Sequence, residues 1–307
     1  MSVGVVVVAH RSREDVVALL GDLDAATPVV VVDTASGDGT AEAVRAAATG
    51  RPVRLLELEN TGYARAANAG IRALPAGVAH AVVLNADVRL AADVPDRLAA
   101  VLDADASLGA VGPRVRYPSG APQASARRIP GLGTAVLHGL LGWWWPANPA
   151  TRAYRADPAA TSAAIDAAGP TGTDVVAVDW VSGCAVALRR TAVEAVGGFD
   201  PGYALFVEDV DLCDRLAAAG WGVGLAPRIV VVHRVGGATS RRPLRARLAH
   251  ARGLERFASQ RLPGPLRPAA RLLRPALVAW AVAATVAGRH PDRSSTGERR
   301  THAAVAA

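Results

Sequence analysis

The sequence contains no lysine, so all 34 of its lysine-plus-arginine residues are arginine. Chemistry that requires a lysine, such as Schiff-base formation or a Walker-type phosphate loop, is therefore excluded. Cysteine is also scarce. The two cysteines, Cys184 and Cys213, lack metal-ligand spacing, and we interpret both as small buried apolar residues.

Aromatic residues make up only 4% of the chain, although 51% of it is hydrophobic. Alanine, valine and leucine must therefore fill the core, which favours helices packed on a valine-rich sheet and hence an α/β fold. The longest apolar run, Pro275–Gly288, is shorter than the roughly 20 residues of a membrane span, so we expect no bilayer crossing. MSVGVVVVAH enters a strand without a charged signal region, and we expect a cytoplasmic protein.

The net charge of +7 comes from arginines concentrated after position 240, whereas the first half is nearly balanced. This distribution indicates a basic C-terminal appendage. The basic segment lacks the interleaved aromatics of single-strand binders, and we expect no nucleic-acid partner.

Short valine-rich segments alternate with segments of helical apolar spacing in the first half of the chain. The expected strands are Val3–Val8, Val29–Val32, Val53–Leu58 and Ala81–Leu84; the expected helices are Arg13–Asp24, Thr40–Thr49, Tyr63–Leu74 and Val94–Asp103. Right-handed crossovers make such strands parallel. Polar residues follow each strand, and ligands of parallel sheets bind at these carboxyl ends.

The pattern dissolves over residues 113–173, which we interpret as an irregular insert on the acceptor side. Order returns, with a mixed sheet expected, in Val175–Val181, Ala185–Leu188, the helix Glu208–Ala219, Gly222–Ala226 and Ile229–Val232. We predict a catalytic domain over residues 1–240, amphipathic helices over 241–288 and a disordered tail over 289–307.

Asp33 ends a buried strand in VVVVDTASGDGT, and a Ser-Gly-Asp-Gly turn opens the next helix. A carboxylate in this position accepts hydrogen bonds from a base or from ribose hydroxyls, so Asp33 is a candidate nucleoside ligand. Asp38 fits a turn or helix-cap role.

In ENTGYARAANAGI, Asn60, Gly62 and Asn68 are candidates for contacts to the nucleotide sugar, with a plain helix start as the alternative.

Asn85 and Asp87 lie two residues apart at the end of the fourth expected strand, in VLNADV. In an extended chain, the side chains of two such residues point to the same side. Asp87 is the candidate ligand of a divalent metal, Mg²⁺ or Mn²⁺, that neutralises a departing diphosphate. His233, after Ile229–Val232, is a candidate distant ligand.

Four acids occur between positions 208 and 214 at a predicted helix start. Helical spacing puts Leu212, Leu216 and Ala219 on the buried stripe, with Glu208 and Asp209 beside it. The positive end of the helix dipole favours an ionised carboxylate there, as a general base needs. Asp211 and Asp214 fit ordinary helix-terminal acids.

In this order the motifs resemble the inverting glycosyltransferase family 2 with its GT-A fold, across about residues 3–240: VVDTASGDGT, NTGYARAANAGI, VLNADV, VSGCAVALRR, GGFDPGYALFVEDVDLCDRL and His233. The resemblance implies a Rossmann-like nucleotide-sugar-binding domain with a mostly parallel mixed sheet. It implies Asp209 as base beside Glu208, and a metal at Asp87 and His233. The implied substrate-binding set is Ala9, His10, Asp33, Asn60, Gly62, Asn68, Asn85, Ala86, Trp180, Ser182 and Gly183, with the last three on the acceptor side. Asn85 and Ala86 depart from the family's usual Asn-Pro-Asp and second aspartate.

The segment SARRIPGLGTAVLHGLLGWWWPANPATRAYR further resembles actinobacterial rhamnosyltransferases that act on N-acetylglucosaminyl-diphospho-polyprenol. This implies a dTDP-L-rhamnose donor, a polyprenyl-diphosphate-linked acceptor and a peripheral position on the inner membrane surface. Leu277–Val286 would rest in the interface, and the arginines that would meet anionic head groups are Arg245, Arg247, Arg252, Arg256, Arg267, Arg271 and Arg274. The alternative is an ordinary packed helix pair.

Two other function classes are weighed against this interpretation. A sugar nucleotidyltransferase usually has a glycine-rich N-terminal loop, which VVVVAHRSRED does not offer. A non-catalytic nucleotide-sugar-binding module is the second alternative, because a fold alone confers no activity. The paired acids Glu208 and Asp209 argue against it.

Overall fold

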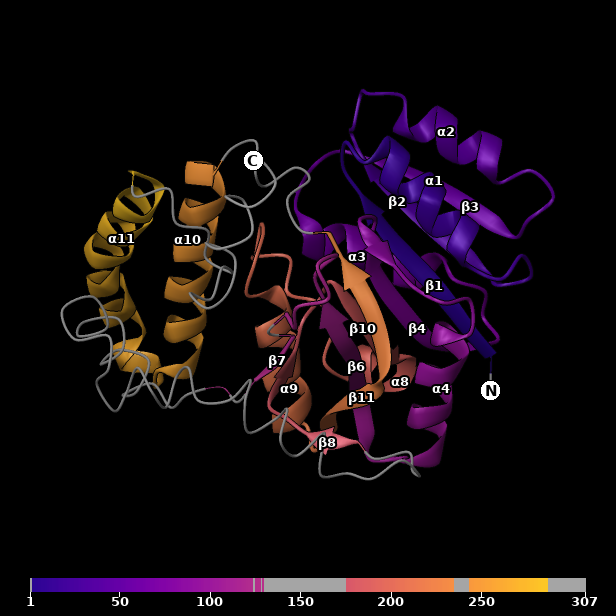
Figure 1. Cartoon of the computed structure of the whole chain (residues 1–307). Helices are drawn as coiled ribbons and strands as arrows, with labels where there is room; N and C mark the ends of the chain where they lie inside the picture. The colour runs from indigo at the N-terminus through magenta and orange to yellow at the C-terminus, as the bar shows by residue number, and fades with distance from the viewer. Residues whose placement is uncertain (1, 124, 128, 130–174, 235–242, 287–307) are drawn as a thin grey trace, which may run out of the picture.

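A computed structural model describes residues 2–123, 125–127, 129, 175–234 and 243–286 (Figure 1). The first half is a series of parallel strands joined by helices, as the alternating pattern predicts. Its elements are β1 (Ser2–Ala9), α1 (Arg13–Asp22), β2 (Val29–Thr34), α2 (Thr40–Ala47), β3 (Val53–Leu58), α3 (Tyr63–Ala73), β4 (Val78–Asn85), β5 (Val88–Arg89) and α4 (Val94–Ala104).

The second half inserts further strands into the same sheet. Its elements are β6 (Leu108–Arg116), β7 (Ala126–Arg127), β8 (Val176–Ala177), β9 (Trp180–Val181), β10 (Ala185–Arg189), α8 (Arg190–Ala195), α9 (Glu208–Ala218) and β11 (Gly222–His233). In the part of the chain that is described, the sheet order is β3-β2-β1-β4-β10-β6-β11-β5, and β8 pairs with β11. Because β10 is antiparallel to both β4 and β6, the sheet is mixed, which confirms the predicted fold class.

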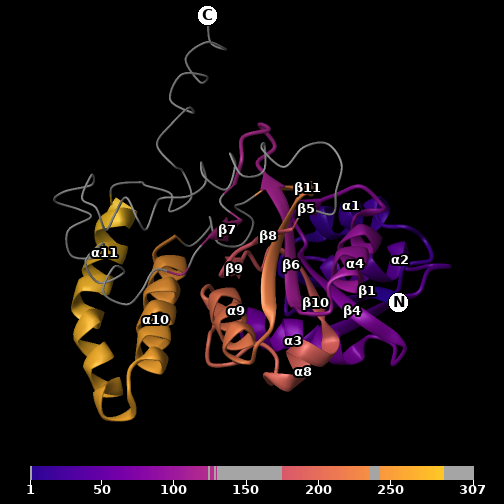
Figure 2. The ribbon, with the colours of Figure 1, turned by 90° about the horizontal axis from the view of Figure 1, so that it is seen from below.

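Helices cover both faces of the sheet, with α1, α2 and α4 on one side and α3, α8 and α9 on the other (Figure 2). Successive valines of β1 point to opposite faces, as the pleat of a strand requires. Val5 and Val7 belong to a buried cluster with Leu19 of α1, whereas Val6 belongs to a second cluster with Leu212 of α9. A strand buried on both faces explains the unbroken valine run.

The strand registers bring the polar motifs to one edge of the sheet. Ala9 pairs with Asp33 and Val8 pairs with Asn85, so the carboxyl ends of β1, β2 and β4 coincide. His233 pairs with Val88 and joins this edge from β11. The site therefore lies where ligands of open α/β sheets bind.

Three predicted boundaries were wrong. The irregular insert was placed from residue 113, but β6 continues to Arg116 and pairs in parallel with β11. Gly222–Ala226 and Ile229–Val232 form one strand, whose register shifts between Ala226 and Val230 at Pro227. Ala219 is exposed and ends α9, so it does not extend the buried stripe.

The C-terminal part forms a helical pair beside the sheet domain: α10 (Pro243–Arg261), the 3₁₀ segment η1 (Gly264–Leu273) and α11 (Arg274–Val286) (Figure 1). Helices are therefore present where they were predicted, over Pro243–Arg261 and Gly264–Val286. Ion pairs Arg256–Asp200 (2.7 Å) and Arg261–Asp214 connect α10 to the sheet domain. The proposed domain boundary at 240 and the predicted tail over 289–307 lie outside the described residues.

The helical segment Gly264–Val286 differs from the expectation of a short apolar run. It is 23 residues long, and its most apolar 18-residue stretch has a mean hydropathy of 1.4, so the segment is long and apolar enough to cross a membrane; only 11% of that stretch is buried. The difference arises because the helix begins before Pro275. Length and composition alone do not separate a span from a helix that lies along a surface.

Candidate active site

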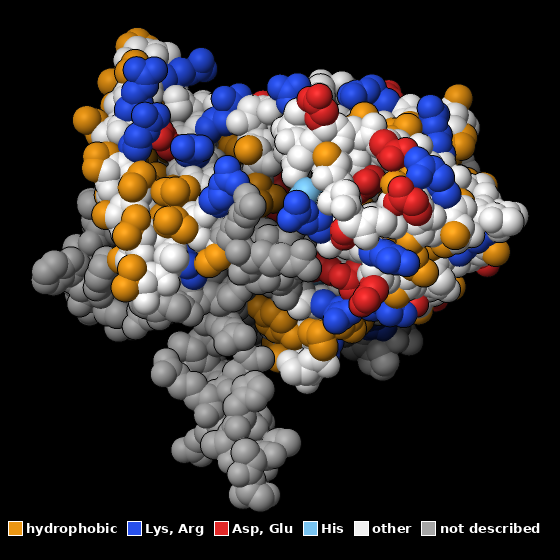
Figure 3. All heavy atoms as spheres, turned by 90° about the horizontal axis from the view of Figure 1, so that it is seen from above, with side chains coloured by type: hydrophobic (Ala, Val, Ile, Leu, Met, Phe, Trp, Pro, Cys, Tyr) orange, Lys and Arg blue, Asp and Glu red, His pale blue; other side chains and the backbone are white. Residues whose placement is uncertain are grey.

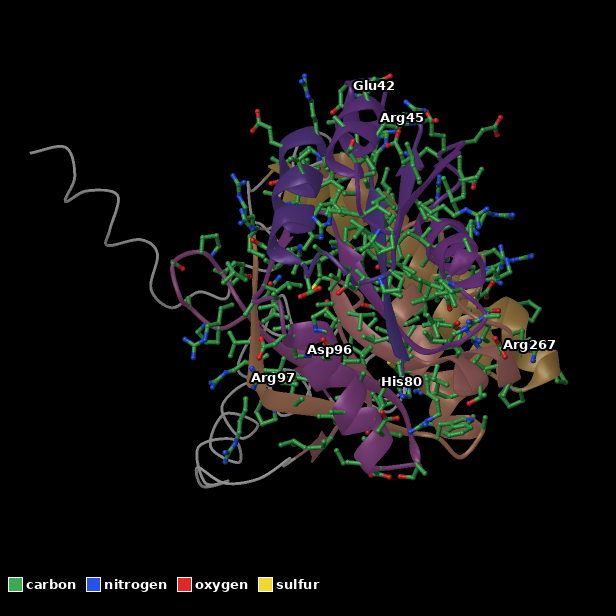
Figure 4. All side chains as sticks on the ribbon, turned by 90° about the vertical axis from the view of Figure 1, so that its right-hand side faces the viewer. Glu42, Arg45, His80, Asp96, Arg97 and Arg267 are labelled. Carbon is green, nitrogen blue, oxygen red and sulfur yellow. The ribbon has the colours of Figure 1, made fainter. Side chains whose placement is uncertain are left out.

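Asp33 lies at the base of a surface hollow of about 580 Å³ between the ends of β2 and β3. Its side chain is 4% exposed and accepts a hydrogen bond from the Ser36 hydroxyl. Ser36 in turn accepts a bond from the Arg11 backbone amide at 2.7 Å. Glu42, which also lines the hollow, lies beside Arg45 on α2 (Figure 4). A fixed carboxylate in an open hollow has the geometry expected of a nucleoside ligand.

His10 connects this hollow to the next loop. Its Nδ1 atom lies 2.7 Å from the carbonyl of Thr34, and the Asn60 amide nitrogen lies 3.4 Å from the same Nδ1 atom. Asn60 is exposed at the edge, as a ligand contact requires. The two side chains thus meet across 50 residues of sequence.

Gly62 and Asn68 have structural explanations that the sequence does not reveal. Gly62 has a φ of +108°, and a Cβ there would lie 2.6 Å from the Ala204 carbonyl oxygen, so the position requires glycine. The Asn68 amide donates to the Phe199 carbonyl (2.7 Å) and accepts from the Phe199 amide (2.9 Å). Asn68 therefore clamps the Phe199 loop, which differs from its predicted contact with the nucleotide sugar.

Asp87 and His233 lie side by side, with 3.2 Å between Asp87 Oδ1 and His233 Nε2. Gln123 Oε1 lies 3.1 Å from His233 Nδ1 on the other side of the ring. Burial lowers the pKa of His233, but Asp87 and the Cys184 thiol outweigh burial and raise it to about 10. The carboxylate and the imidazole, predicted independently from distant motifs, therefore form one cluster.

Asp209 is held by backbone groups at the first turn of α9. The Gly183 amide donates to its Oδ2 atom (2.8 Å), and its Oδ1 atom accepts from the Val210 amide (2.8 Å). Burial raises the pKa of Asp209, while these backbone bonds oppose the shift. A half-buried carboxylate that stays ionisable and has a raised proton affinity suits a general base.

Glu208 has a different environment although it is the adjacent residue. It is 7% exposed, and its Oε2 atom is buried without a hydrogen-bond partner among the described residues. Burial and the charge of Asp209 raise its pKa to about 8. Tyr63 closes this corner by donating from its hydroxyl to the Gly183 carbonyl (2.7 Å), and burial raises its pKa well above the usual range.

The backbone before α9 explains how both acids are presented. Phe206 and Val207 have φ values of +68° and +71°, a conformation that non-glycine residues rarely adopt. The two residues reverse the chain directly before Glu208. Such local strain persists only where surrounding contacts impose it, and it is often found at functional sites.

The structure corrects several further predictions. The side chains of Ala9 (0% exposed) and Ala86 (4% exposed) pack in the core, so a substrate contact at either residue would be made by the backbone. Asp211 is not an exposed helix-terminal acid, because it is 3% exposed and receives a bond from Arg215. Asp214 pairs with Arg261 of α10.

The three residues predicted for the acceptor side lie together. Trp180 and Ser182 flank Val181 in and after β9, and Gly183 contacts Asp209. The Ser182 amide donates to the Ser125 carbonyl at 2.8 Å. Asn85 donates its backbone amide to the Cys184 carbonyl at 2.9 Å, which ties the metal-side loop to the acceptor-side loop.

Sequence reasoning missed Tyr63, Gln123 and the surroundings of Cys184. Tyr63 stands inside the quoted motif NTGYARAANAGI, so its place there was an available signal. Gln123 falls within a segment interpreted as irregular, and its distance of 110 residues from His233 gave no sign of contact. Both cysteines are buried as predicted, and burial raises the pKa of Cys213 to about 12.

Two comparisons by sequence agree with this arrangement. Residues 2–253 match the family described as "Glycosyltransferase like family 2". The chain is 35% identical over 284 aligned positions to the N-acetylglucosaminyl-diphospho-decaprenol L-rhamnosyltransferase of Mycobacterium tuberculosis, strains CDC 1551 / Oshkosh and ATCC 25618 / H37Rv. That alignment covers 86% of this chain and 87% of the relative.

Solved structures show the same fold. The mannosyltransferase PcManGT from Pyrobaculum calidifontis, in complex with GDP-Man and Mn²⁺, has a TM-score of 0.52 at 24% identity and aligns over 94% of this chain and 76% of its own. GalNAc-T7 with UDP, GalNAc and Mn²⁺ has a TM-score of 0.57 at 15% identity over 95% of this chain and 58% of its own. The predicted GT-A-type α/β fold is confirmed, and the chain belongs to glycosyltransferase family 2.

Proposed function

We propose that this glycosyltransferase transfers L-rhamnose from dTDP-L-rhamnose, with inversion, to a polyprenyl-diphosphate-linked N-acetylglucosamine in the synthesis of a cell-wall polysaccharide linker. The observation that carries the proposal is the half-buried Asp209, fixed by the Gly183 amide beside the sheet edge that also holds Asp33 and Asp87. The printed name of the Mycobacterium tuberculosis relative supports the choice of sugar and acceptor.

In the proposed reaction Asp209 accepts the proton of the acceptor hydroxyl as that oxygen attacks the anomeric carbon. The Gly183 and Val210 amides hold the carboxylate in place, so little reorganisation is needed when the proton moves. Glu208, with its pKa of about 8, stays protonated near neutral pH. A protonated neighbour spares Asp209 the repulsion of a second buried charge.

Asp33 and the hollow around it are the proposed nucleoside site. The carboxylate is fixed by Ser36, and the hollow reaches Glu57 and Glu59 at the end of β3. In the sheet, β1 lies between β2, which carries Asp33, and β4, which precedes Asp87. A nucleotide sugar bound in the hollow would therefore extend across the end of β1 toward Asp87. His10 and Asn60 lie beside this path.

Asp87 and His233 are the proposed ligands of Mg²⁺ or Mn²⁺. The Asp87 carboxylate is a ligand type that both cations prefer, and His233, which its pKa of about 10 keeps protonated beside Asp87, would release a proton on binding the cation. Among the described residues no three His, Cys, Asp or Glu side chains gather as a ready-made site, so donor phosphates and water must supply the other ligands. When bound, the cation supplies charge neutralisation for the departing nucleotide diphosphate.

We further propose that the enzyme works at the cytoplasmic surface of a membrane, where a polyprenyl-linked acceptor resides. Apolar side chains on α11 are exposed, with Val278, Trp280 and Val282 between 36% and 45% and Val286 at 84%. Figure 3 shows arginine and apolar side chains intermixed over this helical lobe. Such a surface suits an anionic bilayer interface.

A donor and acceptor panel tests the proposal. The enzyme is incubated with Mn²⁺, with dTDP-, UDP- or GDP-sugars and with a prenyl-diphospho-GlcNAc, and the lipid product is weighed. We expect a deoxyhexose mass increment with dTDP-rhamnose and little with the others. Transfer from another donor alone would refute the rhamnosyl assignment, and the absence of transfer or donor hydrolysis with every donor would refute the proposed activity.

A further inference from the structure

Two N–H donors on the proposed acceptor side are buried with unsatisfied hydrogen-bonding capacity. Among the described residues, Arg127 Nε has no partner, and Trp180 Nε1 has only an interaction with Asp209 that falls short of good hydrogen-bond geometry. The two residues are directly opposed in the antiparallel pair β7–β9. Directly opposed side chains of an antiparallel pair lie on the same face, so both donors belong to one surface.

The guanidinium of Arg127 differs from the other partly buried arginines near the site. Arg215 pairs with Asp211 (2.8 Å), Arg261 with Asp214, and Arg189 donates to the Leu108 carbonyl (2.9 Å). Within the described ranges, no carboxylate or carbonyl is bonded to the Arg127 side chain. Removing a cation partly from water without a partner costs free energy. We therefore infer that an anionic ligand pairs with Arg127 when this face is occupied.

The position of this face relative to the catalytic acids is fixed by backbone contacts. The Arg127 carbonyl accepts from the Asp179 amide (3.2 Å), and Ser125 accepts from Ser182 (2.8 Å). The Trp180 indole N–H is aimed at Asp209, whose pKa it lowers, without completing a hydrogen bond. An anion bound by Arg127 would therefore lie close to Asp209.

We propose that Arg127, assisted by the Trp180 indole N–H, binds the diphosphate of the acceptor; this inference rests on the proposed function. The reaction brings two diphosphates to the enzyme. The donor diphosphate belongs at Asp87 and His233, where a cation binds. The acceptor diphosphate is attached to the sugar whose hydroxyl Asp209 deprotonates, so it lies about one sugar ring from that base. A planar guanidinium matches two phosphate oxygens at once.

The discriminating experiment measures binding by calorimetry without donor or metal. Farnesyl-diphospho-GlcNAc, the neutral octyl glycoside of GlcNAc and inorganic diphosphate are titrated into the wild type, Arg127→Gln, Arg127→Lys and the control Arg72→Gln. Arg72 is exposed in the last turn of α3. We expect Arg127→Gln to bind the diphospho-lipid at least tenfold more weakly and the neutral glycoside unchanged. The affinity of Arg127→Lys for the diphospho-lipid should lie between those of the wild type and Arg127→Gln. Lysine keeps the positive charge but loses the planar guanidinium that donates two parallel hydrogen bonds.

Binding of dTDP with Mn²⁺ to each variant reports whether the fold and the donor site are intact. Equal affinity of Arg127→Gln and wild type for the diphospho-lipid would overturn the proposal. An equal loss of affinity for the neutral glycoside would also overturn the proposal, because it would indicate a structural role for Arg127. A loss of affinity confined to dTDP would overturn it as well, because it would place Arg127 at the donor site. If the wild type ignores both GlcNAc ligands, the proposed acceptor is wrong. Binding of inorganic diphosphate that depends on Arg127 would then still support the anion site, and its absence would refute it.

Discussion

Glu208 and Asp209 are neighbours in sequence, yet their surroundings give them different chemistry. Asp209 receives two backbone hydrogen bonds, whereas Glu208 Oε2 has none among the described residues. Hydrogen bonds to the charged form keep a buried carboxylate ionisable, and their lack favours the protonated form. The account therefore assigns the base role to Asp209 and a neutral, supporting role to Glu208.

The ionisation of Glu208 should make stability depend on pH. Its pKa is about 8 in the folded chain, above its ordinary value of 4.5, so the folded state holds the proton more tightly. Stability is then lost as pH rises from about 4.5 to about 8. Relative to Glu208→Gln, the wild type should lose roughly 2–4 kcal/mol of unfolding free energy across this window.

Urea unfolding at a series of pH values measures this difference. Glu42→Gln serves as a control, because Glu42 lies on the surface of α2 with its side chain 75% exposed. Its curve should run parallel to that of the wild type. Parallel curves for Glu208→Gln as well would show that Glu208 is not buried as described.

Gln123 should control the orientation of His233. Its Oε1 atom faces His233 Nδ1, which leaves Nε2 directed at Asp87. Loss of such an outer partner typically weakens metal binding by about 10–100-fold. Gln123→Met should show this loss in Mn²⁺ titrations followed by electron paramagnetic resonance with dTDP present.

Gln123→Glu is the matched variant, because it keeps an oxygen acceptor for the ring N–H and should retain most of the affinity. An unchanged Mn²⁺ affinity in Gln123→Met would contradict the positioning role. Equal losses in both variants would contradict it too, since they would indicate disturbance of the loop.

At the residue scale, the sequence predicted the positions of side chains that directly follow a strand. It did not predict the contacts of side chains whose partners lie far away in the sequence. Strand ends predicted the common edge for Asp33 and Asp87, because parallel registers align such ends. Asn68 and Asp211 were misjudged since their partners, Phe199 and Tyr203, lie in a loop whose path no periodicity reveals.

At the scale of elements, α10 packs against the strained turn that precedes the two proposed catalytic acids. A Cβ on Gly253 would lie 3.0 Å from both the Phe206 carbonyl oxygen and Val207 Cγ2. The Phe206 ring also contacts His250 of α10, at 5.5 Å between centroids, and His250 contacts Trp280 of α11 at 5.9 Å. The helical pair therefore supports the left-handed conformation of Phe206 and Val207.

Gly253→Val should push this turn away from its position. We expect a loss of about 1–3 kcal/mol in stability from overpacking, with a lower kcat and unchanged binding of dTDP. Steady-state kinetics and thermal unfolding provide the two measurements.

The matched control is Gly21→Val in α1, where an added Cβ meets nothing within 4 Å. It should keep its kcat. A Gly253→Val enzyme with wild-type kcat would show that α10 does not hold the catalytic turn.

Element prediction was most accurate for long periodic segments. The four N-terminal strands and helices were recovered within a few residues, because valine runs and helical spacing are strong local signals. β6 was missed because Gly112 and Pro113 interrupt its sequence, and its pairing with β11 is non-local. β11 was split at Pro227, where the structure has a register shift within one strand.

At the scale of the whole molecule, the basic C-terminal surface is smaller than the sequence predicts. Arg247 is buried and bonds to Thr285, Arg256 pairs with Asp200, and Arg274 pairs with Glu255. These three arginines stabilise the helical pair and its contact with the sheet domain. The predicted arginines that are exposed and make no ion pair with a described residue are Arg245, Arg252, Arg267 and Arg271.

Replacing these four exposed arginines with glutamine should weaken binding to anionic vesicles. Each arginine near such a surface contributes about 1 kcal/mol, so most binding should be lost at low salt. Flotation with phosphatidylglycerol vesicles measures it. The control is the double variant Arg54→Gln/Arg72→Gln, which replaces exposed arginines on β3 and α3. This variant should bind and float with the vesicles as the wild type does. A wild type that stays soluble at low salt would refute the membrane proposal.

The central claim is that Asp209 is the general base, and the kinetics of Asp209→Asn test it most directly. Asparagine keeps the shape and an oxygen acceptor for the Gly183 amide but cannot take a proton. The account predicts normal folding, wild-type binding of dTDP with Mn²⁺ and a kcat lowered by about 10²–10⁴-fold. A kcat within a few-fold of the wild type would contradict it.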